Sequence, residues 1–162
     1  MFFWFVASAV LVVLFVFDSP SVDYRFVVLG GVAPLIEDVS GRPLVLHTLI
    51  GSVGLLALVM LFTRGRRILR RQILGAPIGT FVFLVTSGAW SRTGLFWWPM
   101  AGVDEIARRP LPEFDRPLAL LVVMELIGLV AMVWLVAKFE LADQGNRRRL
   151  AQTGRLPREL LR

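Results

Sequence analysis

Long apolar runs that are almost free of charge limit what this chain can fold into. The longest, Leu118–Ala137, holds twenty residues in which Glu125 is the only charged side chain. Hydrophobic residues make up 56% of the chain, and its mean hydropathy is +0.70. A helix needs about 20 apolar residues to cross the hydrocarbon core of a bilayer. We therefore expect an integral membrane protein in which Glu125 needs a partner inside the membrane.

Four such runs are separated by polar or turn-forming segments, and they predict an all-α, polytopic membrane protein with four transmembrane helices. Between the first two runs lies an eleven-residue apolar piece, Phe26–Ile36, which contains Gly30, Gly31 and Pro34 and is too short to span. We expect it to form a short re-entrant or interfacial segment. The four predicted spans are Phe2–Phe17, Leu44–Phe62, Ile73–Trp90 and Leu118–Ala137.

Arginine and lysine are unevenly divided among the connecting segments. The segment 63–72 carries five and the tail 138–162 carries seven, against two in 18–43 and four in 91–117. Basic residues concentrate in cytoplasmic loops, so the segments 63–72 and 138–162 should be cytoplasmic and the other two should face outward. This division predicts a transmembrane domain over 1–137, a basic cytoplasmic tail over 138–162 and a multi-pass topology with both termini in the cytoplasm.

The net charge of +6 comes from basic residues that flank the apolar runs. Anionic lipids of the bilayer, and not nucleic acid, are therefore the expected partners of these residues. The absence of cysteine excludes disulfides and thiolate metal ligands. Lys138 is the only lysine, a bias typical of GC-rich bacterial genomes, so the expected location is a bacterial inner membrane. The arginines expected to contact anionic lipid are Arg64, Arg66, Arg67, Arg70, Arg71, Arg147, Arg148 and Arg149.

Polar residues inside or beside the spans gather in the half of the bundle that is predicted to face outward. His47 is expected either to be an interfacial histidine bonded to a carbonyl, or to bind a ligand or transfer protons. Glu125 is expected either to be structural, protonated or paired with Arg116 or Arg92, or to act as a functional acid or ligand. The pocket candidates are Glu37, Asp38, Arg42, His47, Thr86, Ser87 and Glu125.

Small residues recur at helical spacing on three of the runs. Such residues let membrane helices approach closely, so the faces that carry them should point into the bundle. The three predicted faces are His47, Gly51 and Gly54 on the second run; Gly75, Gly79, Phe83 and Ser87 on the third; and Glu125, Gly128 and Met132 on the fourth.

Several short motifs match a known pattern. Gly31–Asp38 looks like a G-x-x-x-P-D-x-D type segment, and Arg42–Thr48 looks like an H-x-G-x-x-H-S type segment that opens a span. Phe83–Ser87 falls where an H-L-x-x-D segment is expected, and Leu95–Pro99 looks like an F-x-P stretch. In these features the chain resembles the YdjM-like family of bacterial inner-membrane proteins, which are described as metal-dependent hydrolases. The resemblance covers about half of the chain.

The chain departs from the family pattern at positions that the metal-dependent hydrolysis implied by the resemblance would need. Phe83 and Ser87 stand where the family has histidine and aspartate, and phenylalanine cannot bind a metal. For a divalent metal, which the resemblance implies as cofactor, Asp38, His47 and Glu125 are the weak candidates that remain. We expect a non-catalytic accessory component of the cell envelope that holds a lipid, another membrane protein or a second copy, with an outward-facing polar pocket. The alternative is a membrane-embedded metal-dependent hydrolase of a lipid-linked ester or phosphoester.

Overall fold

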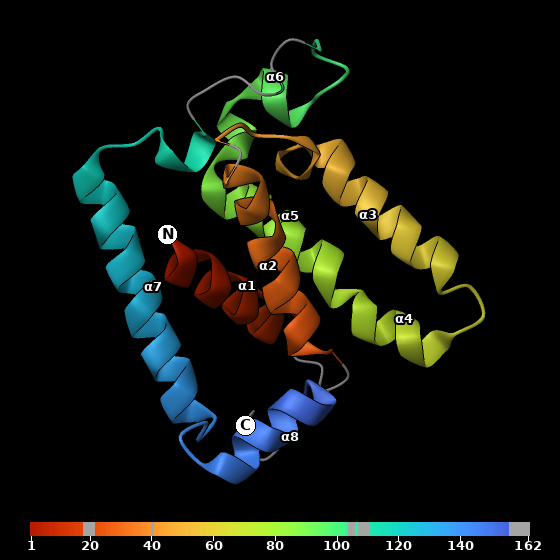
Figure 1. Cartoon of the computed structure of the whole chain (residues 1–162), viewed down its shortest axis with the longest axis vertical. Helices are drawn as coiled ribbons and strands as arrows, with labels where there is room; N and C mark the ends of the chain where they lie inside the picture. The colour runs from red at the N-terminus through yellow and green to blue at the C-terminus, as the bar shows by residue number, and fades with distance from the viewer. Residues whose placement is uncertain (18–21, 40, 104–105, 107–110, 156–162) are drawn as a thin grey trace.

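The computed structural model describes residues 1–17, 22–39, 41–103, 106 and 111–155, with the backbone alone at residue 38. Every regular element in these residues is a helix (Figure 1), so the predicted all-α class is confirmed. Three 3-10 turns, η1 (Val45–His47), η2 (Ala89–Ser91) and η3 (Pro112–Phe114), lie between α-helices. The α-helices are α1 (Phe2–Phe17), α2 (Tyr24–Asp38), α3 (Leu49–Phe62), α4 (Arg67–Ile73), α5 (Gly75–Ser87), α6 (Thr93–Phe96), α7 (Leu118–Lys138) and α8 (Gln144–Thr153).

Two helical stretches in the described residues are long and apolar enough to cross a membrane, by length and composition. They are residues 67–87, which comprise α4 and α5, and α7. Each has 21 residues, which is about 32 Å of helix at 1.5 Å per residue. α1 and α3 are apolar but shorter. The predicted second span begins later than expected, because Val45–His47 form η1 and α3 starts at Leu49.

α2 and α5 lie side by side with their backbones in contact (Figure 1). A Cβ atom on Gly30 of α2 would collide with the carbonyl of Ala76, and one on Gly79 of α5 would collide with the carbonyl of Val27. Only glycine permits an approach this close, as at small-residue interfaces between membrane helices. The predicted inward face of the third run is confirmed, since all four of its residues are buried: Gly75, Gly79, Phe83 and Ser87.

A proline inside α2 accounts for the hydrogen bond that joins α2 to α5. Pro34 has no N–H, so the carbonyl of Gly30, four residues earlier, loses its partner within the helix. The hydroxyl of Thr80 on α5 donates to this carbonyl at 3.2 Å and also to the carbonyl of Ala76 at 3.1 Å. Thr80 is fully buried. The proline therefore leaves an acceptor that α5 satisfies, and α2 remains helical through Asp38.

α3 packs on α5 with only part of its predicted face. Gly51 is buried, but a Cβ atom on Gly54 would meet nothing within 4 Å. His47 lies in η1, before the helix begins at Leu49, so it does not share the helical phase of the two glycines. The predicted face of His47, Gly51 and Gly54 is therefore wrong at Gly54.

α1 runs alongside α7 in the same direction (Figure 1). Trp4 lies against Gly128, near the middle of α7, while Leu14 shares a core cluster with Phe139, just beyond the end of α7. The predicted topology, in which the first and fourth spans cross in opposite directions, is therefore wrong for this pair. The predicted directions are wrong because the prediction did not count α2 as a helix. α2 comes after α1 in the chain and runs in the opposite direction.

α2 extends from one end of the bundle to the other. Its first residue, Tyr24, donates its N–H to the carbonyl of Gly154 at 2.8 Å, next to the end of α8. Its last turn holds Glu37, which contacts His47 at the opposite end of the bundle. The piece Phe26–Ile36 is thus not a separate short segment but part of a continuous helix packed on α5, and its position relative to the membrane stays a prediction.

The contact between Tyr24 and Gly154 also corrects the predicted sides of the membrane. The start of the segment 18–43 and the tail lie together, although the uneven charge predicts that they face opposite sides. The arginine-rich segment 63–72 lies toward the same end as α8 (Figure 1), in agreement with the prediction that it shares a side with the tail. Which of the two sides is cytoplasmic stays a prediction, as does the cytoplasmic location of both termini.

Much of the apolar surface of the bundle faces outward. α7 buries only Met124, Gly128 and Leu135, while Val130 on its outer face is 69% exposed. α3 likewise exposes Phe62 and most of its leucines. Apolar patches of this extent are rare on proteins that face water, and they suit contact with lipid chains.

Candidate functional site

His47 lies fully buried between two carboxylates at the end of the bundle away from α8. Its Nδ1 is 2.9 Å from an oxygen of Glu37, and its Nε2 is 3.6 Å from an oxygen of Glu113. The side chains of His47 and Glu113 are both 0% exposed, and that of Glu37 is 13% exposed. We call Glu37, His47 and Glu113 the histidine cluster. The imidazole therefore presents one ring nitrogen to each of the two acids.

Glu37 also organises the turn that positions His47. Its carboxylate accepts the backbone N–H of Leu44 at 3.0 Å and that of Leu46 at 3.0 Å. Directly after His47, the hydroxyl of Thr48 caps α3 by accepting the N–H of Gly51 at 3.0 Å. One carboxylate at the end of α2 therefore holds both the backbone of the η1 turn and the imidazole that the turn presents.

Phe83 of α5 encloses the imidazole from the side. Its ring stands edge-on to His47, with the ring centroids 5.3 Å apart and an interplanar angle of 87°. The same ring packs on Phe5 of α1, with centroids 4.4 Å apart. The cluster therefore joins α1, α2, α5 and the loop before α7 in one packed contact.

Glu113 is absent from the candidates that the sequence offers. It lies in η3, in the polar segment 91–117, where an acidic residue looks like a solvated loop residue. Its neighbours are the sequence feature that could have indicated its burial, because Leu111 and Pro112 before it are apolar and are also buried. An acid next to apolar residues that a fold buries is the kind that needs a cationic or hydrogen-bonding partner.

The histidine cluster is not arranged to bind a metal ion. The two carboxylates approach opposite ring nitrogens, so the three groups do not converge on one point. Among the described residues there is no group of three or more His, Cys, Asp or Glu side chains that could hold a metal. Of the weak metal candidates, the side chain of Asp38 lies outside the described residues and Glu125 is engaged with α1. The arrangement suits a buried ionic contact between helices better than hydrolysis.

Glu125 binds the N-terminal end of α1. Its carboxylate accepts the N–H of Phe3 at 3.2 Å and that of Trp4 at 3.4 Å, and it lies 3.6 Å from the ammonium group of Met1. The first N–H groups of a helix have no partner within the helix, and the helix dipole makes that end positive. The structural alternative for Glu125 therefore accounts for its contacts: it is a helix cap supplied by a neighbouring helix.

The arginines expected to pair with Glu125 bind elsewhere. Arg116 donates to the carbonyl of Ser87 at 2.8 Å, at the C-terminal end of α5, where a cation is favourable. Arg92 pairs with Asp115 at 2.7 Å. The predicted pairing of Glu125 with Arg116 or Arg92 is therefore wrong.

The remaining pocket candidates are dispersed over the same end of the bundle. The hydroxyl of Thr86 donates to the carbonyl of Val82 within α5, and that of Ser87 donates to the carbonyl of Leu84. Arg42 is exposed in the connection between α2 and η1. The structure thus brings Glu37 and His47 into direct contact, while the two hydroxyls bond to the backbone of α5 and, for Ser87, also accept the N–H of Ala89.

The arginines form a second candidate site at the other end of the bundle. α4 and α8 both lie toward this end (Figure 1), and neither helix buries a residue. Most of the predicted lipid-contacting arginines are exposed, and Arg70 is partly exposed. The arginines in question are Arg64, Arg66, Arg67, Arg70 and Arg71 in and before α4, and Arg147, Arg148 and Arg149 in α8.

Comparisons with protein-family models, with curated proteins and with solved structures find no match to this chain. The resemblance to the YdjM-like family therefore stays a prediction. What the chain does has to be inferred from the two ends of its bundle and from the apolar surface between them.

Proposed function

We propose that this chain is a polytopic protein of a bacterial inner membrane that binds anionic lipids at its arginine-rich end and has an accessory, non-catalytic role. Four crossings would come from α2, α3, α5 and α7, which alternate in direction, and α4 would lie before the α5 crossing with its arginines outside the hydrocarbon layer. α1 would enter the bilayer only part of the way, because it begins beside Glu125 and not at the end of α7.

The observation that carries this proposal is the separation of charge from apolar surface. The exposed arginines of α4 and α8 lie toward one end of the bundle (Figure 1), and exposed apolar side chains cover much of α3 and α7. Arginines just outside a hydrocarbon layer meet lipid phosphates, and each contributes about 1 kcal/mol to binding at an anionic surface. That end would face the cytoplasm, where basic residues concentrate.

An accessory role is favoured over hydrolysis by the way the polar residues are used. Glu37 holds a turn, Glu125 caps α1, and Phe83 occupies the flank of His47. A hydrolase with a metal-activated water would need ligands that converge on an open position. Among the described residues, the buried carboxylates bind backbone N–H groups, Arg25 and His47.

Quenching of tryptophan fluorescence by brominated lipids tests the proposal. Trp134 is 43% exposed on α7, one turn before Lys138, so a variant that keeps it as the single tryptophan reports the lipids near the arginine-rich end. We expect brominated phosphatidylglycerol to quench more than brominated phosphatidylcholine, and the excess to shrink in high salt and in the triple variant Arg147→Gln, Arg148→Gln, Arg149→Gln. Arg42→Gln, at the opposite end, is the matched control and should keep the excess.

Two results would contradict the proposal. Equal quenching by the two lipids would remove the anionic preference. Release of the protein from membranes by alkaline carbonate washing would remove the integral membrane location.

A further inference from the structure

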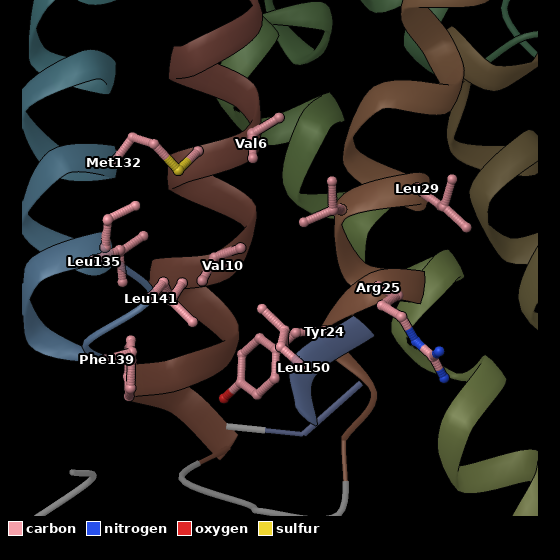
Figure 2. A pocket seen from close by; sticks show the side chains of 12 residues that line it. Val6, Val10, Tyr24, Arg25, Leu29, Met132, Leu135, Phe139, Leu141 and Leu150 are labelled. Carbon is pink, nitrogen blue, oxygen red and sulfur yellow. The ribbon is translucent and has the colours of Figure 1, made fainter. Parts of the chain in front are cut away.

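An apolar groove of about 440 Å³ runs between α1, α2 and α7 (Figure 2). Its size is within the roughly 300–1,000 Å³ of small-molecule sites. Val6 and Val10 of α1 lie between Met132 on α7 and Leu29 on α2, and Leu150 of α8 lies near the lower end. Every lining side chain except those of Tyr24 and Arg25 is apolar. From Met132 to Phe139 the groove follows α7 for about 10 Å.

α8 is fastened across the lower end of this groove by α2. The guanidinium of Arg25 donates to the carbonyl of Ala151 at 2.7 Å, and the N–H of Tyr24 binds the carbonyl of Gly154. The remaining nitrogens of Arg25 bind both oxygens of Asp23, at 3.0 and 2.7 Å. The charge of Arg25 is therefore compensated within the protein, and its role is to position α8.

Exposed arginines at this end of the groove lie on α8 and, just after it, at Arg155. Arg147 is exposed and lies three residues before Leu150, so the two are neighbours on one face of the helix. Arg148 lies two residues before Leu150 and faces another direction. An apolar channel that ends beside a free-standing arginine complements a molecule with a hydrocarbon chain and an anionic head.

We infer that the groove holds one acyl chain of an anionic diacyl phospholipid, whose phosphate binds Arg147. This inference rests on the proposed function and assigns a discrete site to it. Side chains of three helices line the rest of the groove: the acyl chain would lie on Val10 of α1, with Val28 of α2 on one side and Met132 of α7 on the other. The second acyl chain would remain in the bilayer.

Native mass spectrometry of the protein in dodecyl maltoside tests the site. The probes are phosphatidylglycerol and phosphatidylcholine with the same palmitoyl and oleoyl chains. We expect one phosphatidylglycerol per chain, with about fivefold higher occupancy than phosphatidylcholine, because both heads carry a phosphate but only phosphatidylglycerol keeps a net negative charge beside the arginine. Arg147→Gln should remove this preference, and Arg148→Gln, on the same helix, should keep it.

A second pair of variants tests the acyl chain. Val28→Phe fills the groove and should lower the occupancy of both lipids several-fold, whereas Val130→Phe, on the exposed face of α7, should leave it unchanged. Leu29→Trp provides a second filling variant at a position that is 61% exposed, where a larger side chain does not disturb the core. Helical circular dichroism and gel filtration show which variants are folded.

Three outcomes would overturn the inference. They are equal occupancy by the two lipids, full occupancy in folded Val28→Phe and Leu29→Trp, and a lipid-free dimer whose interface these variants disrupt. None of these outcomes would contradict the proposed function if brominated phosphatidylglycerol still quenches more than brominated phosphatidylcholine. Loss of that excess in the unmodified protein would instead remove the proposed function itself.

Discussion

Two pairs of helices in this bundle are joined in similar ways but in different surroundings. α2 and α5 meet at Gly30 and Gly79, and α1 and α7 meet at Gly128, where a Cβ atom would collide with the backbone of Trp4. Beside each contact a polar side chain bonds to the backbone of the partner helix, Thr80 in the first pair and Glu125 in the second. In both pairs the two helices run in the same direction (Figure 1).

The two pairs differ in which backbone group has no hydrogen-bond partner within its own helix. In α2 a proline frees a carbonyl, and a neutral hydroxyl that is fully buried satisfies it. In α1 the start of the helix frees N–H groups, and a carboxylate that is 31% exposed satisfies them. A glycine thus permits the approach in each pair, while the chemistry of the unsatisfied group selects the polar partner. The α2–α5 contact should be the stronger of the two, because it is completely enclosed.

Substitution of Gly79 should have the largest effect. In Gly79→Ala the added methyl group meets the carbonyl of Val27, so the α2–α5 pair has to separate. We expect a loss of about 3 kcal/mol in the free energy of unfolding, the upper part of the usual range for an overpacked core. Reversible unfolding in SDS measures it. Gly54→Ala, where space is open, is the control and should be neutral or stabilising by up to about 1 kcal/mol.

Gly128→Ala should come next, with a smaller and more local effect. The methyl group would displace the start of α1 from α7 and so separate Glu125 from the N–H of Phe3. We expect a loss of about 2 kcal/mol. Hydrogen exchange should accelerate at the first turns of α1 and not in α2. Equal acceleration in both helices would mean that the two pairs are not independent.

Thr80→Val tests the bond that Pro34 makes necessary. We expect a loss of about 1 kcal/mol, the scale of hydrogen bonds between membrane helices. The double variant with Pro34→Ala sharpens the test, because alanine restores an N–H that can bond to Gly30 within α2. Thr80→Val should then cost less than in the presence of the proline. If Thr80→Val costs the same stability with and without Pro34→Ala, the hydrogen bond of Thr80 does not depend on the proline, and this explanation is wrong.

Glu125→Gln should have the smallest effect. The amide keeps an oxygen that accepts an N–H of α1 and loses only the charge, which is worth roughly 0.3–1 kcal/mol at a helix N-terminus. Glu125→Ala removes the acceptor too and should cost about 1–2 kcal/mol. If the two variants lose equal stability, the charge is the whole contribution and the cap contributes nothing.

The sequence predicts the long elements of this fold well. The apolar runs predict the bounds of α1 and α7 to within a residue, because long runs with almost no charge are buried in protein or in lipid. The face of Gly75, Gly79, Phe83 and Ser87 is buried as expected, since four-residue spacing follows directly from helical geometry. Of the candidate site, the contact between Glu37 and His47 agrees with their predicted common level.

The elements that the sequence misses depend on contacts across the chain. The sequence marks only the eleven apolar residues Phe26–Ile36 of α2, and nothing near Pro34 reveals that Thr80 binds the carbonyl that this proline frees. The direction of α1 depends on α2 in turn. Glu113 looks like a loop residue until η3 is placed against His47. Each miss concerns a polar group whose partner is distant in the chain.

The polar bonds of the two helix pairs also differ in how far apart along the chain their partners lie. Thr80 and Gly30 are separated by 50 residues, whereas Glu125 and Phe3 are separated by 122. Contacts between distant segments form only after the intervening chain is made, and they close the longer loop. During synthesis, α2 and α5 can therefore pair while α7 is still to be made. The first turn of α1 stays uncapped until α7, which supplies Glu125, has been made. The contact at the start of α1 is therefore among the last to form.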